Sequence, residues 1–238
     1  MPIRLQQLAA ALLIGAASLS TAASAQTAPT AHVADATDLM TYLAVSGVNV
    51  YGSNAYITWD GTSSAARTSC STFLTLLFGH SYGWLASTFK PWFGTASPNA
   101  AQFHDTIAAQ NGFLRVDRID DMDAGDILAV IYPPDETTSG HVAILAAKPT
   151  KRTASAPVVT GTTQYDTVVI DSSASGHGSA DTRYRAAAKT FTGGIGKGTM
   201  RLYVNALGTV VGYTWSTYSN SDFYTQADRD LVVGRLNR

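Results

Sequence analysis

Cys70 is the only cysteine in the 238-residue chain. It begins an apolar stretch, residues 70–78, that the sequence predicts to be a helix. Farther along, residues 140–145 are predicted to form a strand that opens on His141, and residues 168–171 a strand that ends on Asp171. A thiol at a helix N-terminus, an imidazole and a carboxylate are the groups of a cysteine-nucleophile hydrolase. Together they predict an enzyme.

Each of these side chains has a chemical role in such a reaction. Only the thiolate form of a cysteine attacks well, and a thiol with a pKa of about 8.5 is mostly protonated at neutral pH. A helix N-terminus stabilises the thiolate of Cys70, and His141 accepts the proton. Asp171 fixes the tautomer and orientation of that imidazole. The backbone N–H of Cys70 is a candidate donor to the reaction's oxyanion.

The same residues also have structural interpretations, which the sequence alone leaves open. A lone cysteine is either a buried apolar side chain or a thiol kept free for use. A histidine at the start of a strand is often structural, and an aspartate after a strand is often a turn former. The joint occurrence of Cys70, His141 and Asp171 favours the catalytic interpretation.

The other histidines carry weaker signals. His80 and His104 are interpreted as surface residues. His177, between Gly176 and Gly178, is an alternative third residue, or a contact to substrate or metal. No H-E-x-x-H or paired-cysteine spacing is present, so neither a metal nor a cofactor is predicted.

Charge and hydropathy limit the partners. The 16 Lys+Arg residues nearly balance the 17 Asp+Glu residues, and no basic block argues for nucleic acid. Residues 1–25 are predicted to be a signal peptide, with Arg4, an apolar run too short to span a bilayer, and small residues at 23–25. No later segment is apolar enough to cross a membrane, so the protein is expected in a periplasm or outside the cell. Its oligomeric state is left open.

The remaining chain is predicted to form one domain. Residues 26–34 are interpreted as a flexible leader and 35–238 as a single catalytic domain with a C-terminal extension, 191–238. Helices come first and strands follow, which predicts an α+β fold with an antiparallel sheet. The expected strands are 127–132, 141–147, 167–171, 199–204 and 210–215. Residues 51–64, 148–163 and 172–182 are expected to be irregular, and Gly193–Gly198 a flexible lead into a strand.

Five segments resemble motifs of the NlpC/p60 cysteine peptidases, a family of papain-like cell-wall hydrolases. Residues 68–73, Thr-Ser-Cys-Ser-Thr-Phe, are similar to the family's Asp-Cys-Ser-Gly-Phe. Residues 124–128, Ala-Gly-Asp-Ile-Leu, and 139–144, Ser-Gly-His-Val-Ala-Ile, are similar to Pro-Gly-Asp-Leu and His-Val-Gly-Ile. Residues 169–173, Val-Ile-Asp-Ser-Ser, resemble Ile-His-Ala-Ser, and 56–62, Tyr-Ile-Thr-Trp-Asp-Gly-Thr, resemble Tyr-Val-Trp-Gly-Gly-Thr.

The resemblance implies a papain-like NlpC/p60 fold with Cys70 as nucleophile, His141 as base and Asp171 as orienting group. Tyr56, Ser69 and His177 are then assigned to oxyanion stabilisation or substrate contact. The implied substrate is a peptide bond in a peptidoglycan stem peptide, or in another peptide.

Two departures from the family's motif, Ser69 for aspartate and Thr72 for glycine, leave alternatives open. One is a non-catalytic wall-binding module on the same fold. The other is a papain-like amidase or acyltransferase acting on a substrate outside the wall.

Overall fold

The computed structural model describes residues 30–237. The predicted signal peptide, 1–25, and the first part of the expected leader lie outside these residues. Within the described range the chain begins with helix α1 (Ala31–Ser46), and helices α2 (Cys70–Tyr82), α3 (Ala86–Phe93) and α4 (Ala100–Ala108) follow before the main run of strands. None of these helices is both long and apolar enough to cross a membrane.

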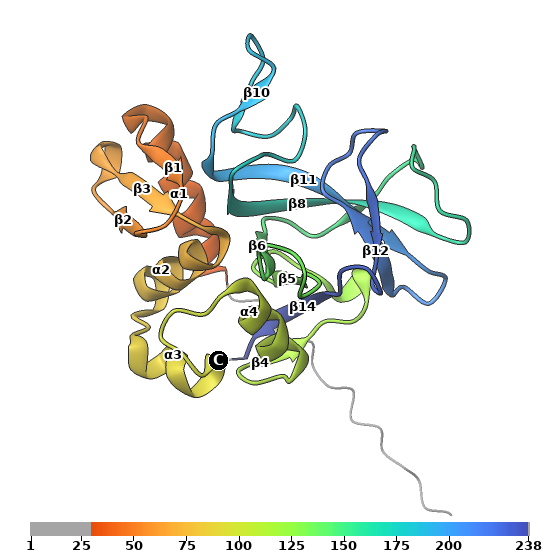
Figure 1. Ribbon diagram of the computed structural model, residues 1–238, viewed down its shortest axis with the longest axis horizontal. Helices are drawn as coiled ribbons and strands as arrows, with labels where there is room; N and C mark the ends of the chain where they lie inside the picture. The colour runs from red at the N-terminus through yellow and green to blue at the C-terminus, as the bar shows by residue number, and fades with distance from the viewer. Residues whose placement is uncertain (1–29, 238) are drawn as a thin grey trace, which may run out of the picture.

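A nine-stranded antiparallel sheet makes up most of the second half of the molecule (Figure 1). Its strand order is β13-β12-β11-β8-β6-β5-β14-β4, with β7 beside β8. Its strands are β4 (Phe113–Arg115), β5 (Ile127–Ile131), β6 (Gly140–Leu145), β7 (Thr150–Lys151), β8 (Thr163–Ser173), β11 (Gly194–Val204), β12 (Val210–Thr214), β13 (Phe223–Thr225) and β14 (Leu231–Leu236). The predicted α+β class is confirmed, and the five expected strands correspond to β5, β6, β8, β11 and β12.

The large sheet is buried on both faces. Along β5, Ile127 and Ala129 pack into the core beneath the helices, whereas Leu128 and Val130 pack into a second core. That second core is closed by β11 and β12, through residues such as Met200 on β11 and Tyr213 on β12. Such two-sided burial explains why β5 is a continuous apolar run and not an alternating one.

A three-stranded sheet precedes helix α2. It consists of β1 (Asn49–Tyr51), β2 (Tyr56–Thr58) and β3 (Ala65–Thr68), in the order β1-β3-β2 with β1 parallel to β3. The prediction of irregular structure over 51–64 was therefore wrong for β2 and for the end of β1. Strands this short carry too few residues to show an alternating pattern.

The helix boundaries differ from the sequence prediction at two places. Residues 31–34, expected in the leader, form the first turn of α1, and His32 is fully buried there. The buried positions His32, Ala36, Leu39 and Leu43 follow a helical period that starts at the histidine. Helix α2 continues past Gly79 and ends at Gly83, whose φ of 66° provides the left-handed cap.

Two segments expected to be flexible are held by hydrogen bonds. In the 148–163 segment, Gln164 Nε2 donates to the carbonyls of Ser155 and Pro157, at 2.8 and 3.0 Å. The Arg201 guanidinium donates to the carbonyls of Ser155 and Ala156. The glycine-rich stretch at 193–198 is largely part of β11, paired along its length with the end of β8.

Candidate active site

The nucleophile candidate lies at the first position of α2. Ser69 is the N-cap: its hydroxyl accepts from the Thr72 backbone N–H, and the Thr72 hydroxyl accepts from the Ser69 backbone N–H at 2.8 Å. This reciprocal capping box fixes the start of the helix and leaves the thiol of Cys70 at its N-terminal end. The two departures from the family motif, Ser69 and Thr72, thus form one local structure. The Ser69 hydroxyl takes part in the cap, and its predicted contact with substrate stays a prediction.

A buried pair of hydroxyls connects this helix start to the large sheet. Thr68 Oγ1 donates to Ser172 Oγ at 2.9 Å, and Ser172 Oγ donates to the Thr68 carbonyl at 2.9 Å. Thr68 is the last residue of β3 before the cap, and Ser172 follows Asp171 on β8. Both residues are fully buried. We call this contact the Thr68–Ser172 brace, since it sets the position of Cys70 relative to Asp171.

The register of the sheet brings His141 to Asp171. Ile144 on β6 pairs with Ile170 on β8 in antiparallel orientation. His141 and Asp171 are each an odd number of residues from that pair, so both point to the opposite face of the sheet and are diagonal neighbours. His141 Nε2 lies 2.6 Å from Asp171 Oδ2, a length typical of a charge-assisted hydrogen bond.

The other side of the His141 ring faces the sulfur. The thiol of Cys70 is hydrogen-bonded to His141, and the Val142 backbone N–H also donates to the sulfur. Because Nε2 is engaged by Asp171, Nδ1 is the nitrogen available to Cys70. Cys70 is 7 % exposed and packs against the helical core on its far side. The three predicted residues are therefore in contact, in the order thiol, imidazole, carboxylate.

The electrostatics of these contacts favour a thiolate–imidazolium pair. Burial raises the pKa of Cys70, but the charge and hydrogen bond of His141 outweigh it and lower that pKa below its ordinary value. Burial likewise opposes the charged form of His141, but Cys70 and Asp171 outweigh it and raise the pKa of His141 to about 10. Each charge is stabilised by the other, which is the condition for an activated nucleophile at neutral pH.

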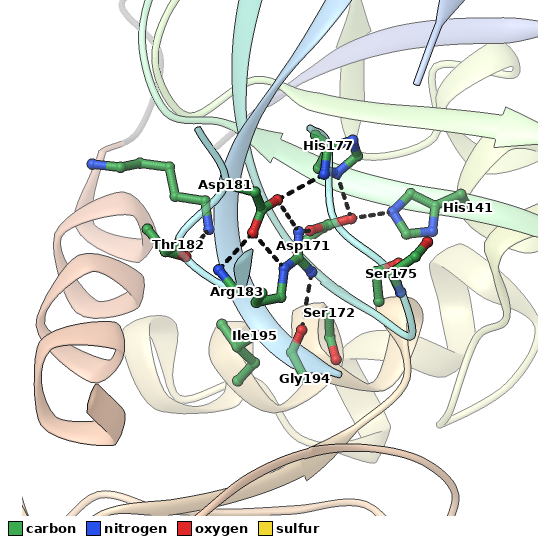
Figure 2. A network of polar contacts seen from close by, with 12 residues as sticks. His141, Asp171, Ser172, Ser175, His177, Asp181, Thr182, Arg183, Gly194 and Ile195 are labelled. Atoms are coloured by element: carbon green, nitrogen blue, oxygen red, sulfur yellow. Dashed lines mark hydrogen bonds and ion pairs between the residues drawn. The ribbon is translucent and has the colours of Figure 1, made fainter. Parts of the chain in front are cut away.

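Asp171 has two further partners. His177 Nε2 lies 3.0 Å from the same oxygen, Oδ2, that His141 contacts, and Arg183 Nη2 lies 2.8 Å from Oδ1 (Figure 2). Burial alone would raise the pKa of Asp171, but His177, Arg183 and the hydrogen bond from His141 hold it well below its ordinary range. Asp171 is fully buried, and its charge is matched by two hydrogen bonds at Oδ2 and by the ion pair with Arg183 at Oδ1.

The loop that carries His177 is held by a second carboxylate. Asp181 accepts from the His177 backbone N–H at 2.9 Å and from Arg183 Nε and Nη2 at 2.9 and 2.8 Å (Figure 2). This loop lies across the glycines of β11. A Cβ at Gly198 would come 2.3 Å from Asp181 Oδ2, and one at Gly196 would come 2.5 Å from Arg183 Nε. The glycine-rich sequence thus leaves room for the buried polar loop.

A small cavity opens beside the imidazoles. It has a volume of about 110 Å³ and is lined by Tyr132, His141, Ser173, Ser175, Gly176, His177 and Trp215. The ring of Trp215 stands edge-on to His141, with centroids 5.1 Å apart. A cavity with an aromatic wall next to His141 is suited to hold part of a substrate.

The structure places Tyr51, and not Tyr56, near the nucleophile. Tyr51 pairs with Thr68, whose side chain points inward, and it feels the negative charges of both Cys70 and Asp171. Tyr56 pairs with Arg67 on the outward face and is 41 % exposed. Alternation along β3 decides the outcome, because Arg67 and Thr68 point to opposite faces. Tyr56, the predicted oxyanion donor, therefore points away from Cys70, and Tyr51 lies on the face of this sheet that is near Cys70.

The two histidines predicted at the surface differ. His80 is exposed and its ring stacks on Trp59 at 3.8 Å. His104 is 7 % exposed and bridges Asp105 and Asp230, each at 3.0 Å. The prediction was right for His80 and wrong for His104, which lies on the inner face of α4.

His141, Asp171 and His177 are close enough together to be considered as metal ligands, since their ligand atoms all lie within 4.8 Å of one another. Their arrangement fits hydrogen bonding better. Both Nε2 atoms converge on one carboxylate oxygen, and the Arg183 guanidinium lies against the other. A guanidinium at that distance would repel a bound cation.

Comparison with known proteins identifies a family but no function. The chain is 32 % identical over 179 residues to an uncharacterized protein, R653, of Acanthamoeba polyphaga mimivirus. The match covers 71 % of this chain and 78 % of the viral protein. The chain belongs to the family of that viral protein. Neither a family model nor a solved structure matches the chain, so what this family does has to be argued from the site.

Proposed function

We propose that the protein is a cysteine-nucleophile hydrolase that cleaves amide bonds through Cys70, His141 and Asp171. The observation that carries the proposal is the pair of contacts on the His141 ring, with sulfur on one side and Asp171 Oδ2 at 2.6 Å on the other. Neither contact is needed to fold a strand. Together they give a thiolate a proton carrier in fixed orientation.

The reaction follows from these positions. The thiolate of Cys70 attacks the amide carbon, and a C–S bond forms as the carbonyl oxygen becomes an oxyanion. The His141 imidazolium gives its proton to the amide nitrogen, and the C–N bond breaks to leave a thioester. Neutral His141 then takes a proton from water, whose oxygen attacks the thioester. Release of the carboxylic acid restores the thiolate and the imidazolium.

Two groups of this chain are placed to stabilise the oxyanion. The first N–H groups of a helix have no partner within the helix, which makes the backbone N–H of Cys70 available for the oxyanion. The hydroxyl of Tyr51 is the second donor. Burial, together with the charges of Cys70 and Asp171, raises the pKa of Tyr51, so its hydroxyl keeps the proton that it would donate.

The substrate class rests on the resemblance to NlpC/p60 peptidases and on the cavity beside His141. We propose a papain-like site of that type that acts on a peptide of the bacterial wall. The cavity is small and its walls are aromatic, hydroxyl and backbone groups. A short peptide chain with compact side chains would fit it better than a bulky or highly charged group.

The test uses the fact that Cys70 is the only cysteine. Iodoacetamide labelling therefore reports on this thiol without mutagenesis. We expect Cys70 to react at pH 6 at least about 10-fold faster than free cysteine, because its pKa is lowered. Hydrolysis of purified muropeptides should vanish in Cys70→Ala and persist in Ser81→Ala, whose hydroxyl bonds to Asp35 away from the site.

Two results would contradict the proposal. A Cys70 that reacts no faster than free cysteine at pH 6 would favour a non-catalytic binding module. Unchanged turnover in a folded Cys70→Ala protein would exclude this thiol as the nucleophile. The pH profile supplies a third check: hydrolysis should fall as pH rises through about 10, where His141 loses its proton.

A further inference from the structure

The His177 ring has an acceptor on both sides. Nε2 lies 3.0 Å from Asp171 Oδ2, and Nδ1 lies 2.7 Å from the Trp215 backbone carbonyl. A carbonyl oxygen only accepts, and an ionised carboxylate only accepts. Asp171 has an ionised partner at each oxygen apart from His177, because Arg183 Nη2 lies 2.8 Å from Oδ1 and His141 Nε2 lies 2.6 Å from Oδ2. Asp171 is therefore an acceptor for His177, and both nitrogens of His177 must carry a proton. The geometry therefore describes an imidazolium.

With His177 counted as a cation, the buried network is neutral. Its positive groups are His141, His177 and Arg183, and its negative groups are the thiolate of Cys70, Asp171 and Asp181. Buried charges are tolerated when they are paired and hydrogen-bonded. Removal of one cation would leave an uncompensated negative charge around Asp171.

The reaction cycle gives this second cation a function. When His141 passes its proton to the leaving amine, it becomes neutral, and Asp171 loses one of its positive partners. His177 and Arg183 still contact the two oxygens of that carboxylate. Asp171 therefore stays ionised and remains an acceptor for His141, ready for the proton that His141 takes from water.

From these contacts we propose that His177 is a positioning residue of the reaction, a fixed imidazolium that shares Asp171 Oδ2 with His141 and keeps Asp171 ionised through the cycle. The inference rests on the proposed hydrolase function. His177 acts through Asp171 and the orientation of His141. His177 is 5 % exposed, and its backbone N–H donates to Asp181. A buried and anchored imidazole of this kind suits a fixed charge better than a group that exchanges protons with solvent.

The test is the pH profile of Cys70 alkylation in His177→Gln. Glutamine keeps an N–H donor but removes the positive charge. Loss of a nearby cation raises the pKa of every neighbouring group, so both the thiol and the imidazolium of the pair should titrate at higher pH, by about 1 unit. The other titratable groups around the pair, Tyr51 and Tyr132, keep their protons throughout this range because burial and nearby negative charges raise their pKa values.

His104→Gln is the matched control. His104 is also a buried imidazole that bridges two carboxylates, but it lies on α4 and contacts neither Asp171 nor Cys70. We expect its alkylation profile to coincide with that of the unaltered protein. A His177→Gln profile that also coincides, in a protein whose circular dichroism shows it to be folded, would overturn the inference.

A measurement on the unaltered protein makes the test independent of the variant's folding. Nitrogen-15 NMR of labelled histidine distinguishes an imidazolium from either neutral tautomer. At neutral pH we expect the His177 ring to show two protonated nitrogens, and a single protonated nitrogen would overturn the inference. The hydrolase proposal has its own readout, the pKa of Cys70 in the unaltered protein. It would fail if that pKa were no lower than the pKa of free cysteine, whereas a singly protonated His177 would overturn only the inference about His177.

Discussion

Two histidines with little solvent exposure, the buried His32 and the partly buried His141, differ in what their ring nitrogens contact. His32 contacts two neutral groups, the Tyr82 hydroxyl at 2.6 Å and the Gly125 carbonyl at 3.0 Å. His141 contacts a thiolate and a carboxylate. Burial lowers the pKa of His32 to about 4, whereas the charged partners of His141 overcome burial and raise its pKa to about 10.

The comparison shows that burial alone does not decide the charge of an imidazole. Desolvation penalises the charged form at both positions, and only a partner of opposite charge reverses the outcome. The His32 region is therefore a neutral structural contact between α1, α2 and the segment before β5. The His141 region is a charged site in which Cys70 and Asp171 keep the imidazole protonated.

The largest effect should follow from Asp171→Asn. Asparagine keeps the shape of the side chain but removes a charge that stabilises the His141 imidazolium. The pKa of His141 should therefore fall toward the low pKa of His32. The amide can also select the wrong tautomer of the ring. We expect hydrolysis to fall on the order of 10³-fold, measured as the initial rate on purified muropeptides.

Asp105→Asn is the matched control, because Asp105 contacts a histidine too, His104, at 3.0 Å. This carboxylate is exposed and lies away from Cys70, so the rate should stay within about 2-fold of the unaltered protein. Equal losses in the two variants would show that the carboxylate next to His141 has no special role.

His32 should make folding stability depend on pH. Its unfolded pKa is about 6.5 and its folded pKa is about 4. Below pH 6.5 the unfolded chain binds a proton that the folded protein does not, so stability is complete above that pH and is lost as pH falls toward 4. Between pH 7 and pH 5 we expect His32 to contribute a loss of about 2 kcal/mol.

Urea unfolding at the two pH values measures this loss, with His32→Asn as the reference. Asparagine can donate to the Gly125 carbonyl but does not titrate. The unaltered protein should therefore lose about 2 kcal/mol more than the variant between pH 7 and pH 5. An identical pH dependence in both proteins would mean that His32 does not stay neutral in the folded state.

The sequence predicts the positions of the three proposed catalytic side chains better than it predicts the residues around them. Cys70, His141 and Asp171 lie on elements with strong apolar patterns, so their elements and order can be inferred. Arg183 and Asp181 lie in a polar loop without a period, and their roles depend on a contact across the sheet with β11. The glycines at 196 and 198 are a signal of this contact, because a Cβ there would meet Arg183 or Asp181. In the sequence, however, a glycine-rich stretch is equally consistent with a flexible segment.

Local geometry explains the other differences. The choice between Tyr51 and Tyr56 depends on which face of a short strand points inward, and three-residue strands do not show it. The start of α1 could have been found, because His32 continues the helical spacing of Ala36 and Leu39. The polar side chain of His32 conceals this spacing, because the apolar pattern alone begins at Ala36.

The smallest effect should come from the Thr68–Ser172 brace. Ser172→Ala removes the acceptor of the Thr68 hydroxyl and the donor to the Thr68 carbonyl, at a cost of about 1–2 kcal/mol in the free energy of unfolding. The backbone around Cys70 would then be less firmly placed relative to Asp171, and we expect alkylation at pH 6 to slow by about 10-fold.

Thr106→Val is the control, since the Thr106 hydroxyl donates to the Trp92 carbonyl from α4. It should cost similar stability without slowing alkylation. If both variants slowed alkylation equally, the rate would follow global stability, and the brace would be as purely structural as the contacts of His32.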